Sequence, residues 1–393
     1  MKTAIKLAYR NLVGAGLRTW LNVIVLSFSF VVIIWLRGIM AGWDRQAKTD
    51  MTQWEIGGGQ YWQEKFDPFD PFTLLDSHAP VPAEFISEID KGNMEPYLVA
   101  QGTIYPQGRM QSIMIKGINP KQSIFLLPTQ KLDTVISDAI PAVIGSIMSK
   151  NLKIGTGDRM MIQWRDANGT FDASEILITE VFSANVPNVD QSQVYIPLEK
   201  LRSMMSLPGE ATLITYRDGE SVRNEAPAGW IHKTKQDLTA SIDELIKMKT
   251  VGTSILYIIL LLLAMLGIFD TQVLSIFRRQ KEIGTYIALG YTRKQVVGLF
   301  TLEGTMNAVL AALVGAAYGL PFLAWQAKAG WTMPVDSSDF GMAIAQTLYP
   351  AYSAGLVIMT VIIIMLVTFI VSYWPSRRIA RMNPTEALRG RIQ

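Results

Sequence analysis

The sequence predicts an α-helical membrane domain of four transmembrane helices, with a large α+β domain inserted after the first helix. Three observations predict this fold class: four long uncharged segments, basic residues in the short segments beside them, and one long charged segment of ordinary globular character. We therefore divide the chain into three parts. Residues 1–42 hold an N-terminal interfacial helix and the first transmembrane helix, 43–250 the inserted domain, and 251–393 the other three transmembrane helices, a cytoplasmic helix and a basic tail.

The four spans follow from length and composition. About 20 apolar residues are needed to cross roughly 30 Å of hydrocarbon. The segments that meet this requirement are Leu17–Met40, Thr250–Phe269, Gly304–Ala327 and Ala351–Trp374. Pro350 interrupts a longer uncharged run and sets the start of the fourth. The first segment lacks a small-residue cleavage site and exceeds an ordinary signal-peptide core, so we expect it to stay uncleaved.

The distribution of charge predicts the orientation. The N-terminal segment, the second short loop and the C-terminal tail together carry 14 basic residues, against the acids Glu282 and Glu386. Segment 43–250 carries 20 basic and 27 acidic residues, a net charge of −7. The positive-inside rule therefore predicts that both termini and residues 277–298 are cytoplasmic and that segment 43–250 lies outside.

Residues 2–12 place Ile5, Tyr9 and Leu12 on one helical face and basic residues elsewhere. This pattern predicts a short helix in the inner-leaflet interface, and a continuous extension of the first span is the alternative. Residues 43–250 mix helical and strand patterns. The predicted helices are Ala83–Lys91, Ser146–Leu152, Leu198–Met205 and Gln236–Lys249, and the predicted strands are Leu98–Thr103, Ser112–Gly117, Val143–Ile144, Arg159–Trp164, Glu175–Phe182 and Val194–Ile196.

The sequence offers no catalytic apparatus. It contains no Gly-Lys dipeptide and hence no P-loop, and no Cys. His78 and His232 are the only histidines, and neither lies in a metal-ligand spacing. We therefore expect a chain that is not an enzyme and binds no cofactor or metal of its own. A net charge of only +3 gives no indication of a nucleic-acid partner.

The membrane part contains a repeat of small residues and two acidic residues near the ends of spans. Ala311, Gly315 and Gly319 recur every four residues, a spacing that favours close helix packing, although ordinary Gly content in spanning helices is the alternative. Asp270 and Glu303 lie near the cytoplasmic ends of two spans. A proton-coupled carrier places ionisable groups near the midplane, so we expect a structural role for both acids rather than a proton relay.

The loop from Phe277 to Gln295 is the most informative stretch. Ile283, Tyr286, Ile287 and Leu289 follow a helical period and Gly290 provides a stop. A short amphipathic cytoplasmic helix suits docking into a groove of a partner. A helix that rests on lipid is the alternative, and the pattern alone does not separate the two.

This loop resembles the coupling segment of FtsX-like ABC transporter permeases, with their pattern R-x-x-E-I-G-x-x-x-A-L-G. The matching residues are Arg279, Glu282, Ile283, Gly284, Ala288, Leu289 and Gly290. Ala8–Leu12 with Arg18, Glu303-Gly304 and Trp374–Arg389 resemble other parts of the family, with Ser376 and Ile379 where it often has Ala. The stretches Ile115–Pro120, Val143–Leu152 with Gly157-Asp158, and Asp190–Leu198 resemble the lipoprotein-releasing and macrolide-exporter branch.

The resemblance implies a multi-pass protein of the cell inner membrane with a periplasmic domain. It implies a cytoplasmic ABC ATPase dimer as partner, which holds ATP and magnesium, and a second permease subunit of the same or a related chain. The ATPase-coupling residues would be Arg279, Glu282, Ile283, Gly284, Ile287, Leu289 and Gly290. ATP-driven closure would then be transmitted to the periplasmic domain, which is called mechanotransmission.

Three functions follow from the resemblance. The leading one is a permease subunit that releases lipoproteins from the outer leaflet, with a periplasmic carrier as a further partner. The alternatives are export of peptides or small molecules with an outer-membrane partner, and a signalling permease that controls a periplasmic hydrolase. The identity of the substrate and of the ATPase does not follow from the sequence.

Overall fold

The computed structural model describes residues 17–134, 138–219, 225–332 and 347–379. The chain forms two compact units, one from the helical segments at both ends and one mainly from Asp44–Leu245. Two of the unit boundaries, at 43/44 and 245/246, fall inside long helices, Leu17–Met51 and Lys235–Arg278. The same two helices also run unbroken through the predicted domain boundaries at 42/43 and 250/251. The interfacial helix predicted at residues 2–12 and the end of the basic tail lie outside the described residues.

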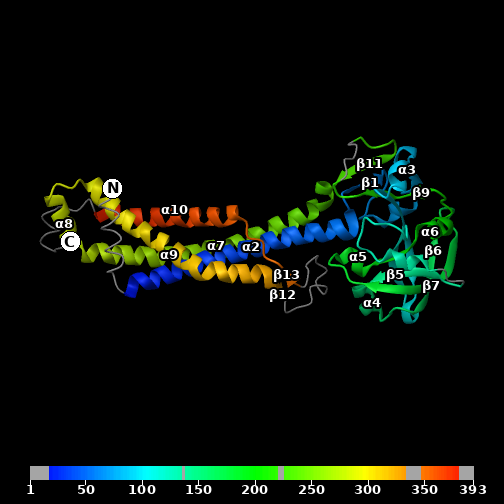
Figure 1. Cartoon of the computed structure of the whole chain (residues 1–393), viewed down its shortest axis with the longest axis horizontal. Helices are drawn as coiled ribbons and strands as arrows, with labels where there is room; N and C mark the ends of the chain where they lie inside the picture. Colours follow the sequence, from blue (N-terminus) through cyan, green and yellow to red (C-terminus); the bar gives the residue numbers. More distant parts are fainter. Residues whose placement is uncertain (1–16, 135–137, 220–224, 333–346, 380–393) are drawn as a thin grey trace. The chain divides into compact units, whose positions relative to one another are not determined.

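The first unit is built from long helices (Figure 1). They are α2 (Leu17–Met51), α7 (Lys235–Arg278), α9 (Arg293–Ala329) and α10 (Ala354–Ile379), with the short α8 (Gln280–Ala288) between α7 and α9. Four helices of the described chain are long and apolar enough to cross a membrane, which confirms the four predicted spans. Helix α9 packs along α10, and the two lie side by side in Figure 1.

All four long helices contribute to one apolar core. Its buried members are Val23, Leu26, Phe30, Ile33, Ala264, Ile268, Ala308, Ala311, Ile364 and Val371. The most apolar window of α2 is 56% buried, whereas that of α7 is only 11% buried. Helix α2 is therefore central in this unit, and α7 presents an apolar surface that water does not favour.

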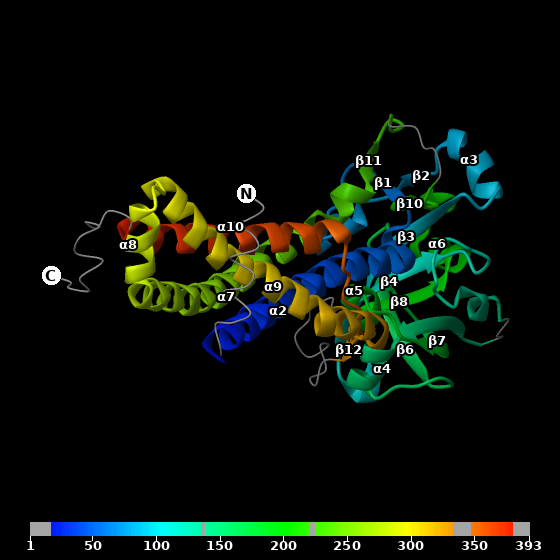
Figure 2. The same cartoon turned by 60° about the vertical axis from the view of Figure 1, so that its left-hand side comes forward.

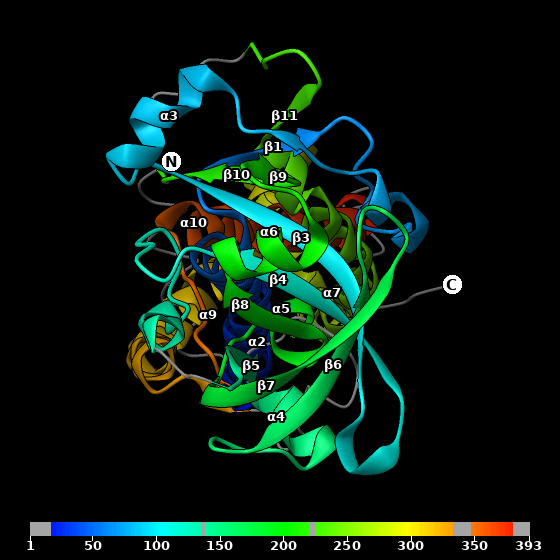
Figure 3. The same cartoon turned by 90° about the vertical axis from the view of Figure 1, so that its right-hand side faces the viewer.

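The second unit is built on a mixed sheet of nine strands in the order β11-β1-β10-β3-β4-β8-β5-β7-β6. The strands are β1 (Gly59–Gln63), β3 (Met94–Ile104), β4 (Gln111–Ile118), β5 (Ile140–Gly145), β6 (Arg159–Arg165), β7 (Phe171–Phe182), β8 (Gln193–Pro197), β10 (Leu213–Tyr216) and β11 (Trp230–Thr234). The end of β3 also pairs with β6, at Gly102–Ile104. The six strands from β3 to β6 therefore close into a barrel, and the other three extend from one edge of β3 (Figure 3).

The remaining described helices and strands are short. The helices are α3 (Ala83–Asp90), α4 (Ser146–Leu152), α5 (Pro187–Gln191) and α6 (Leu198–Met205), and the short strands are β2 (Ala79–Pro80), β9 (Glu210–Ala211), β12 (Trp331–Thr332) and β13 (Thr347–Leu348). A single π turn, Thr52–Ile56, follows α2 directly. The bounds of α4 and α6 confirm the predicted helices residue for residue.

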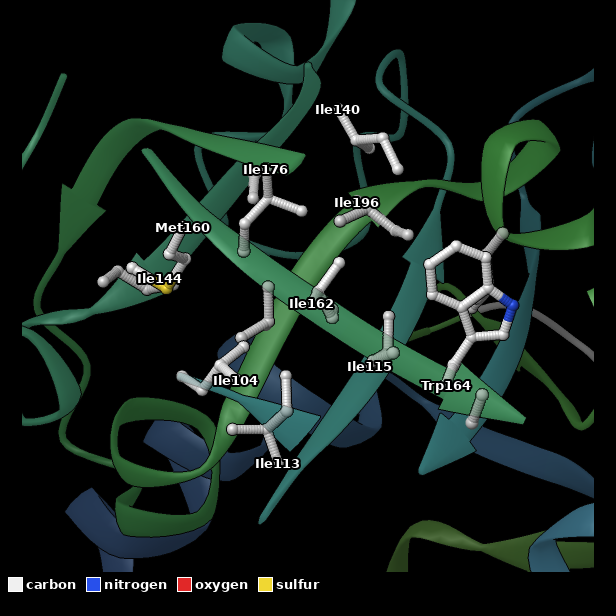
Figure 4. Close-up of a cluster of buried hydrophobic side chains, with 14 of the residues drawn as sticks. Ile104, Ile113, Ile115, Ile140, Ile144, Met160, Ile162, Trp164, Ile176 and Ile196 are labelled. Atoms are coloured by element: carbon white, nitrogen blue, oxygen red, sulfur yellow. The ribbon is translucent and has the colours of Figure 1, made fainter. Parts of the chain in front are cut away.

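Strand alternation gives the barrel two different faces. Successive side chains of a strand point to opposite faces, so Ile113 and Ile115 of β4 lie in the interior while Met114 and Lys116 face outward. The interior is filled largely by isoleucines from neighbouring strands (Figure 4). β-Branched residues pack well on such a surface, and Ile115 and Ile162 are both fully buried. The densely packed interior therefore fixes the positions of the strands that carry the outward-facing side chains, Met114 and Lys116 among them.

Candidate functional site

Helix α8 forms a defined turn between the ends of α7 and α9 (Figure 2). Helix α9 begins with a capping box, in which the side chains of Thr292 and Gln295 each accept a hydrogen bond from the other residue's backbone. Gly290 has a φ of +93°, a left-handed conformation that favours glycine. The predicted stop at Gly290 and the cap two residues later explain why the chain reverses here.

Arg279 anchors the start of α8. Its Nη1 donates to both carboxylate oxygens of Glu303 in α9, at 3.0 and 2.9 Å, and its Nε donates to Glu282 at 2.6 Å. The guanidinium carbon lies 5.0 Å from the centre of the Phe300 ring, a cation–π distance. The side chains of Arg279 and Glu303 are 18% and 11% exposed. Nη1 and Nε of one guanidinium group thus hold two different carboxylates, and such charge-assisted hydrogen bonds are stronger than neutral ones.

A small apolar cluster packs α8 against α9. Ile283 of α8 is buried in a cluster with Val296 and Phe300 of α9, and the partly buried Tyr286 and Ile287 pack against this cluster. Gly284 is buried beside Ile283. Ile283 is 4% exposed, so in this structure its side chain packs within the chain itself, and the expectation that it fills a groove of a partner stays a prediction.

The outer surface of the loop is what remains for a partner. Leu289 is 72% exposed and Tyr291 47% exposed, and the Tyr291 ring lies 5.6 Å from that of Tyr286. Glu282 is exposed despite its bond to Arg279. Exposed basic residues flank this apolar tip, namely Lys281, Arg293 and Lys294. Among the predicted coupling residues, Leu289, Gly290 and Glu282 lie on this outer surface, while Ile287 is half-buried.

The sequence pattern found Arg279 and Glu303 separately but did not bring them together. Their contact depends on the angle between α7 and α9, which the local pattern does not encode. Asp270, the other acid near a span end, is exposed. Val296 and Phe300 were not singled out either, although their spacing of four residues at the start of a helix is a readable signal of a common face.

The small residues of α9 lie against α2 within the first unit. Ala311, Gly315 and Gly319 are all buried. A Cβ added at Gly315 would lie 3.3 Å from the backbone oxygen of Ser27, and one at Gly319 would lie 2.6 Å from Cγ2 of Val31. The absence of side chains at these two glycines thus allows α2 and α9 to approach closely.

Both histidines lie in the second unit and make local contacts. His78 Nδ1 bonds the Glu210 carboxylate, and His232 stacks on Tyr61 and lies 3.1 Å from the Tyr216 hydroxyl. Within the described ranges, no three His, Asp or Glu side chains are grouped closely enough to hold a metal ion. These contacts indicate structural roles for both histidines.

The C-terminal third of the chain matches a known protein family. Residues 254–384 match the model of the family described as FtsX-like permease C-terminal, a range that contains the last part of α7 and all of α8, α9 and α10. A protein of Haemophilus ducreyi named macrolide export ATP-binding/permease protein MacB is 22% identical over 307 residues, 75% of this chain and 38% of that protein. Its namesake in Agrobacterium fabrum is 26% identical over 56% of this chain and 34% of that protein. The chain thus spans well under half of these relatives.

Other relatives differ in name and extent. The lipoprotein-releasing system transmembrane protein LolC of Xylella fastidiosa is 20% identical over 324 residues, 75% of this chain and 76% of that protein. Among solved structures, the extracellular domain of the noncanonic ABC-type transporter YknZ from Gram-positive bacteria aligns with a TM-score of 0.27 and 12% identity. That alignment covers 42% of this chain and 84% of the YknZ domain.

Proposed function

Because the chain contains an FtsX-like permease domain at residues 254–384, we propose that it is the permease component of an ABC transporter whose ATPase lies outside these 393 residues. The ATPase binds ATP and magnesium in the cytoplasm and docks on the outer surface of the loop at Leu289, Tyr291 and Glu282. The MacB relatives join ATP-binding and permease in their name, whereas this chain has no P-loop.

One observation carries the proposal: α8 is locked to α9 but exposes its outer surface. The Arg279–Glu303 pair and the buried Ile283 resist bending of the loop. A displacement imposed at Leu289 therefore moves α9 rather than the loop alone. Helix α9 packs against α10 and, through Gly315 and Gly319, against α2, so the movement reaches the rest of the first unit.

For the substrate, the proposal is release of lipoproteins from the outer leaflet of the inner membrane, with the second unit in the periplasm. The support is coverage: the LolC alignment covers about three quarters of both proteins, whereas the MacB alignments cover two fifths of theirs or less. Export of macrolide-like small molecules is the second candidate, favoured by the names of the MacB relatives. In both cases a second copy or a related permease would cover the exposed apolar face of α7.

The test measures ATPase binding by loop variants. The wild-type chain is purified from native membrane with its ATPase, and the bound ATPase is quantified for Leu289→Asp and Glu282→Lys. A charge in an apolar contact, or a reversed charge at an interface, costs about 3 kcal/mol, roughly a hundredfold in Kd. Both variants should therefore lose the ATPase while still inserting into the membrane.

Matched variants separate docking from other effects. Leu126→Asp changes an equally apolar leucine, 58% exposed in the second unit, and should retain the ATPase. Glu282→Gln removes the negative charge but keeps an oxygen that can accept from Arg279, and it should lose less binding than Glu282→Lys. If the loop only rests on lipid, Glu282→Lys is neutral or favourable beside anionic headgroups, and wild-type ATPase binding by that variant would refute the docking proposal.

A further inference from the structure

The outer face of the barrel in the second unit holds a cavity of about 640 Å³. This volume lies within the range of about 300–1,000 Å³ that is typical of small-molecule sites. Its floor is formed by three adjacent strands, β3, β4 and β8, and its sides by the turns that follow α2 and by the first turns of α7. All of its lining residues belong to the second unit.

Strand alternation explains why the cavity is lined as it is. Tyr97, Met114 and Tyr195 stand on three neighbouring strands and face away from the isoleucine-filled interior. Aromatic rings make up much of the wall, including Trp54, which stacks on Phe182 at 5.7 Å, and Trp62. Met and Leu side chains line the cavity together with these rings. The wall is therefore apolar, and its flexible Met side chains can adjust to the shape of a ligand.

The cavity also has spare hydrogen-bond donors. The hydroxyl of Tyr97 is buried, since the residue is 3% exposed, and it has no hydrogen-bond partner among the described residues. Lys116, directly across from Tyr195 in the sheet, lies 3.8 Å from Glu55, which leaves its ammonium group with unused donor capacity. A buried polar group without a hydrogen-bond partner costs free energy. The unpaired Tyr97 hydroxyl in the cavity wall therefore indicates that a ligand atom forms a hydrogen bond with it.

We propose that this cavity binds one acyl chain, with the apolar chain along the Trp54–Trp62 wall and its carboxylate or ester oxygen accepting hydrogen bonds from Tyr97 and Lys116. An acyl group fits because the wall is apolar and irregular and the donors are gathered at the β3–β4 floor. The inference deepens the proposed function, since an acyl chain is the part of a lipidated substrate that would enter such a site. Binding itself does not require the ATPase.

The test uses photocrosslinking of the full chain in lipid nanodiscs without any ATPase. One arm adds a diazirine-bearing palmitate, and the other builds a diazirine-bearing phosphatidylethanolamine into the bilayer. Irradiation followed by peptide mass spectrometry should place adducts on peptides that carry Trp54, Met114 or Tyr195. Adducts in the palmitate arm identify a free fatty acid as a source, and adducts in the lipid arm identify a bilayer lipid. Both results support the cavity as an acyl site.

Three variants make the result specific. Met114→Trp fills the cavity and should abolish these adducts, whereas Met161→Trp, on the exposed side of β6 outside the cavity, should leave them unchanged. Tyr97→Phe removes only a hydroxyl without a partner, so the fold is preserved and acyl affinity should fall about threefold to tenfold. Adducts absent from the cavity in both arms, or equal in wild type, Met114→Trp and Tyr97→Phe, would overturn the inference. Because the ATPase is absent, such a failure leaves the docking proposal standing.

Discussion

At residue 279, a single guanidinium group contacts the start of α8, the body of α9 and an aromatic ring. The same group in bulk water would gain little from any one of these contacts, because exposed ion pairs are worth about 0–1 kcal/mol. Here both Arg279 and Glu303 are largely removed from water, and the carboxylate is held through two bonds. Removal of either partner would strand a charge, which is the costly change for a buried pair.

We therefore predict that Arg279→Ala loosens α8. Breaking a fully buried pair costs about 3–5 kcal/mol, and the partial exposure here lowers this to about 2–3 kcal/mol. Hydrogen exchange should show faster exchange of the α8 amides, Ile283 among them, with the long helices unaffected. Arg278→Ala is the control, because the neighbouring side chain is exposed and removes the same charge from the cytoplasmic loop. Equal α8 protection in both variants would contradict the anchoring role.

Glu95 predicts a pH dependence in the second unit. The residue is 3% exposed, and one carboxyl oxygen has no hydrogen-bond partner among the described residues. Burial raises the pKa of Glu95 to about 7 from its ordinary value of 4.5. The folded protein thus holds this proton more tightly than the unfolded chain. Its free energy of unfolding should fall by about 3 kcal/mol as the pH rises from about 4.5 to about 7, and then level off.

The measurement compares variants across that window. Glu95→Gln should flatten the dependence and unfold at a higher temperature than wild type at about pH 8, where wild-type Glu95 is ionised. Glu225→Gln, at an exposed position, should retain the wild-type slope. A wild-type slope in Glu95→Gln would assign the pH dependence to another group.

At the scale of elements, local patterns predicted what depends on neighbours in the sequence. Helices Ser146–Leu152 and Leu198–Met205 have both bounds right because a strand ends directly before each and a left-handed residue, Lys153 or Ser206, ends each. The four spans were also readable, since length and lack of charge are enough to define them.

Elements that depend on distant partners were not readable. Strand β1 pairs with β10 and β11, and β10 pairs with β3, each across more than a hundred residues, and the patterns of β1, β10 and β11 alone are short and weak. Closure of the barrel between Gly102 and Trp164 is equally non-local. In the candidate site, the helix and its stop were predicted, but the inward turn of Ile283 was not, because it depends on where α9 begins.

Close packing of α9 against α2 gives a prediction for this pair of helices. A Cβ at Gly319 would lie 2.6 Å from the stiff, buried side chain of Val31, whereas one at Gly298, in the same helix, meets nothing within 4 Å. Gly319→Ala should therefore destabilise the first unit by about 1–3 kcal/mol. Gly298→Ala should be neutral or stabilise by up to about 1 kcal/mol, since Ala favours the helix. Thermal unfolding in detergent gives the midpoints of the two variants. Equal midpoints would show that the space between Gly319 and Val31 accommodates an added methyl group.

At the scale of the whole molecule, the distribution of charge and the exposed apolar surface together limit the functions that the chain can have. The described helices expose more apolar side chains than a protein surrounded by water retains, which requires lipid or a further subunit around the first unit. The second unit carries its own closed core and an aromatic cavity on its outer face. Helix α2 runs unbroken through the unit boundary at 43/44, and helix α7 through the boundary at 245/246.

The orientation of the chain is the last prediction, and the sequence makes it easy to test because it contains no cysteine. A single cysteine is placed at Asn168, an exposed hairpin residue of the second unit, or at Thr285, on the exposed surface of α8. Fourteen basic residues on the short segments, against a net charge of −7 on the long one, favour a cytoplasmic α8 and an external second unit. A membrane-impermeant maleimide should therefore label Asn168→Cys in intact spheroplasts and Thr285→Cys only after permeabilisation. The reverse pattern would place α8 on the side without ATP and would remove the basis for docking to an ATPase.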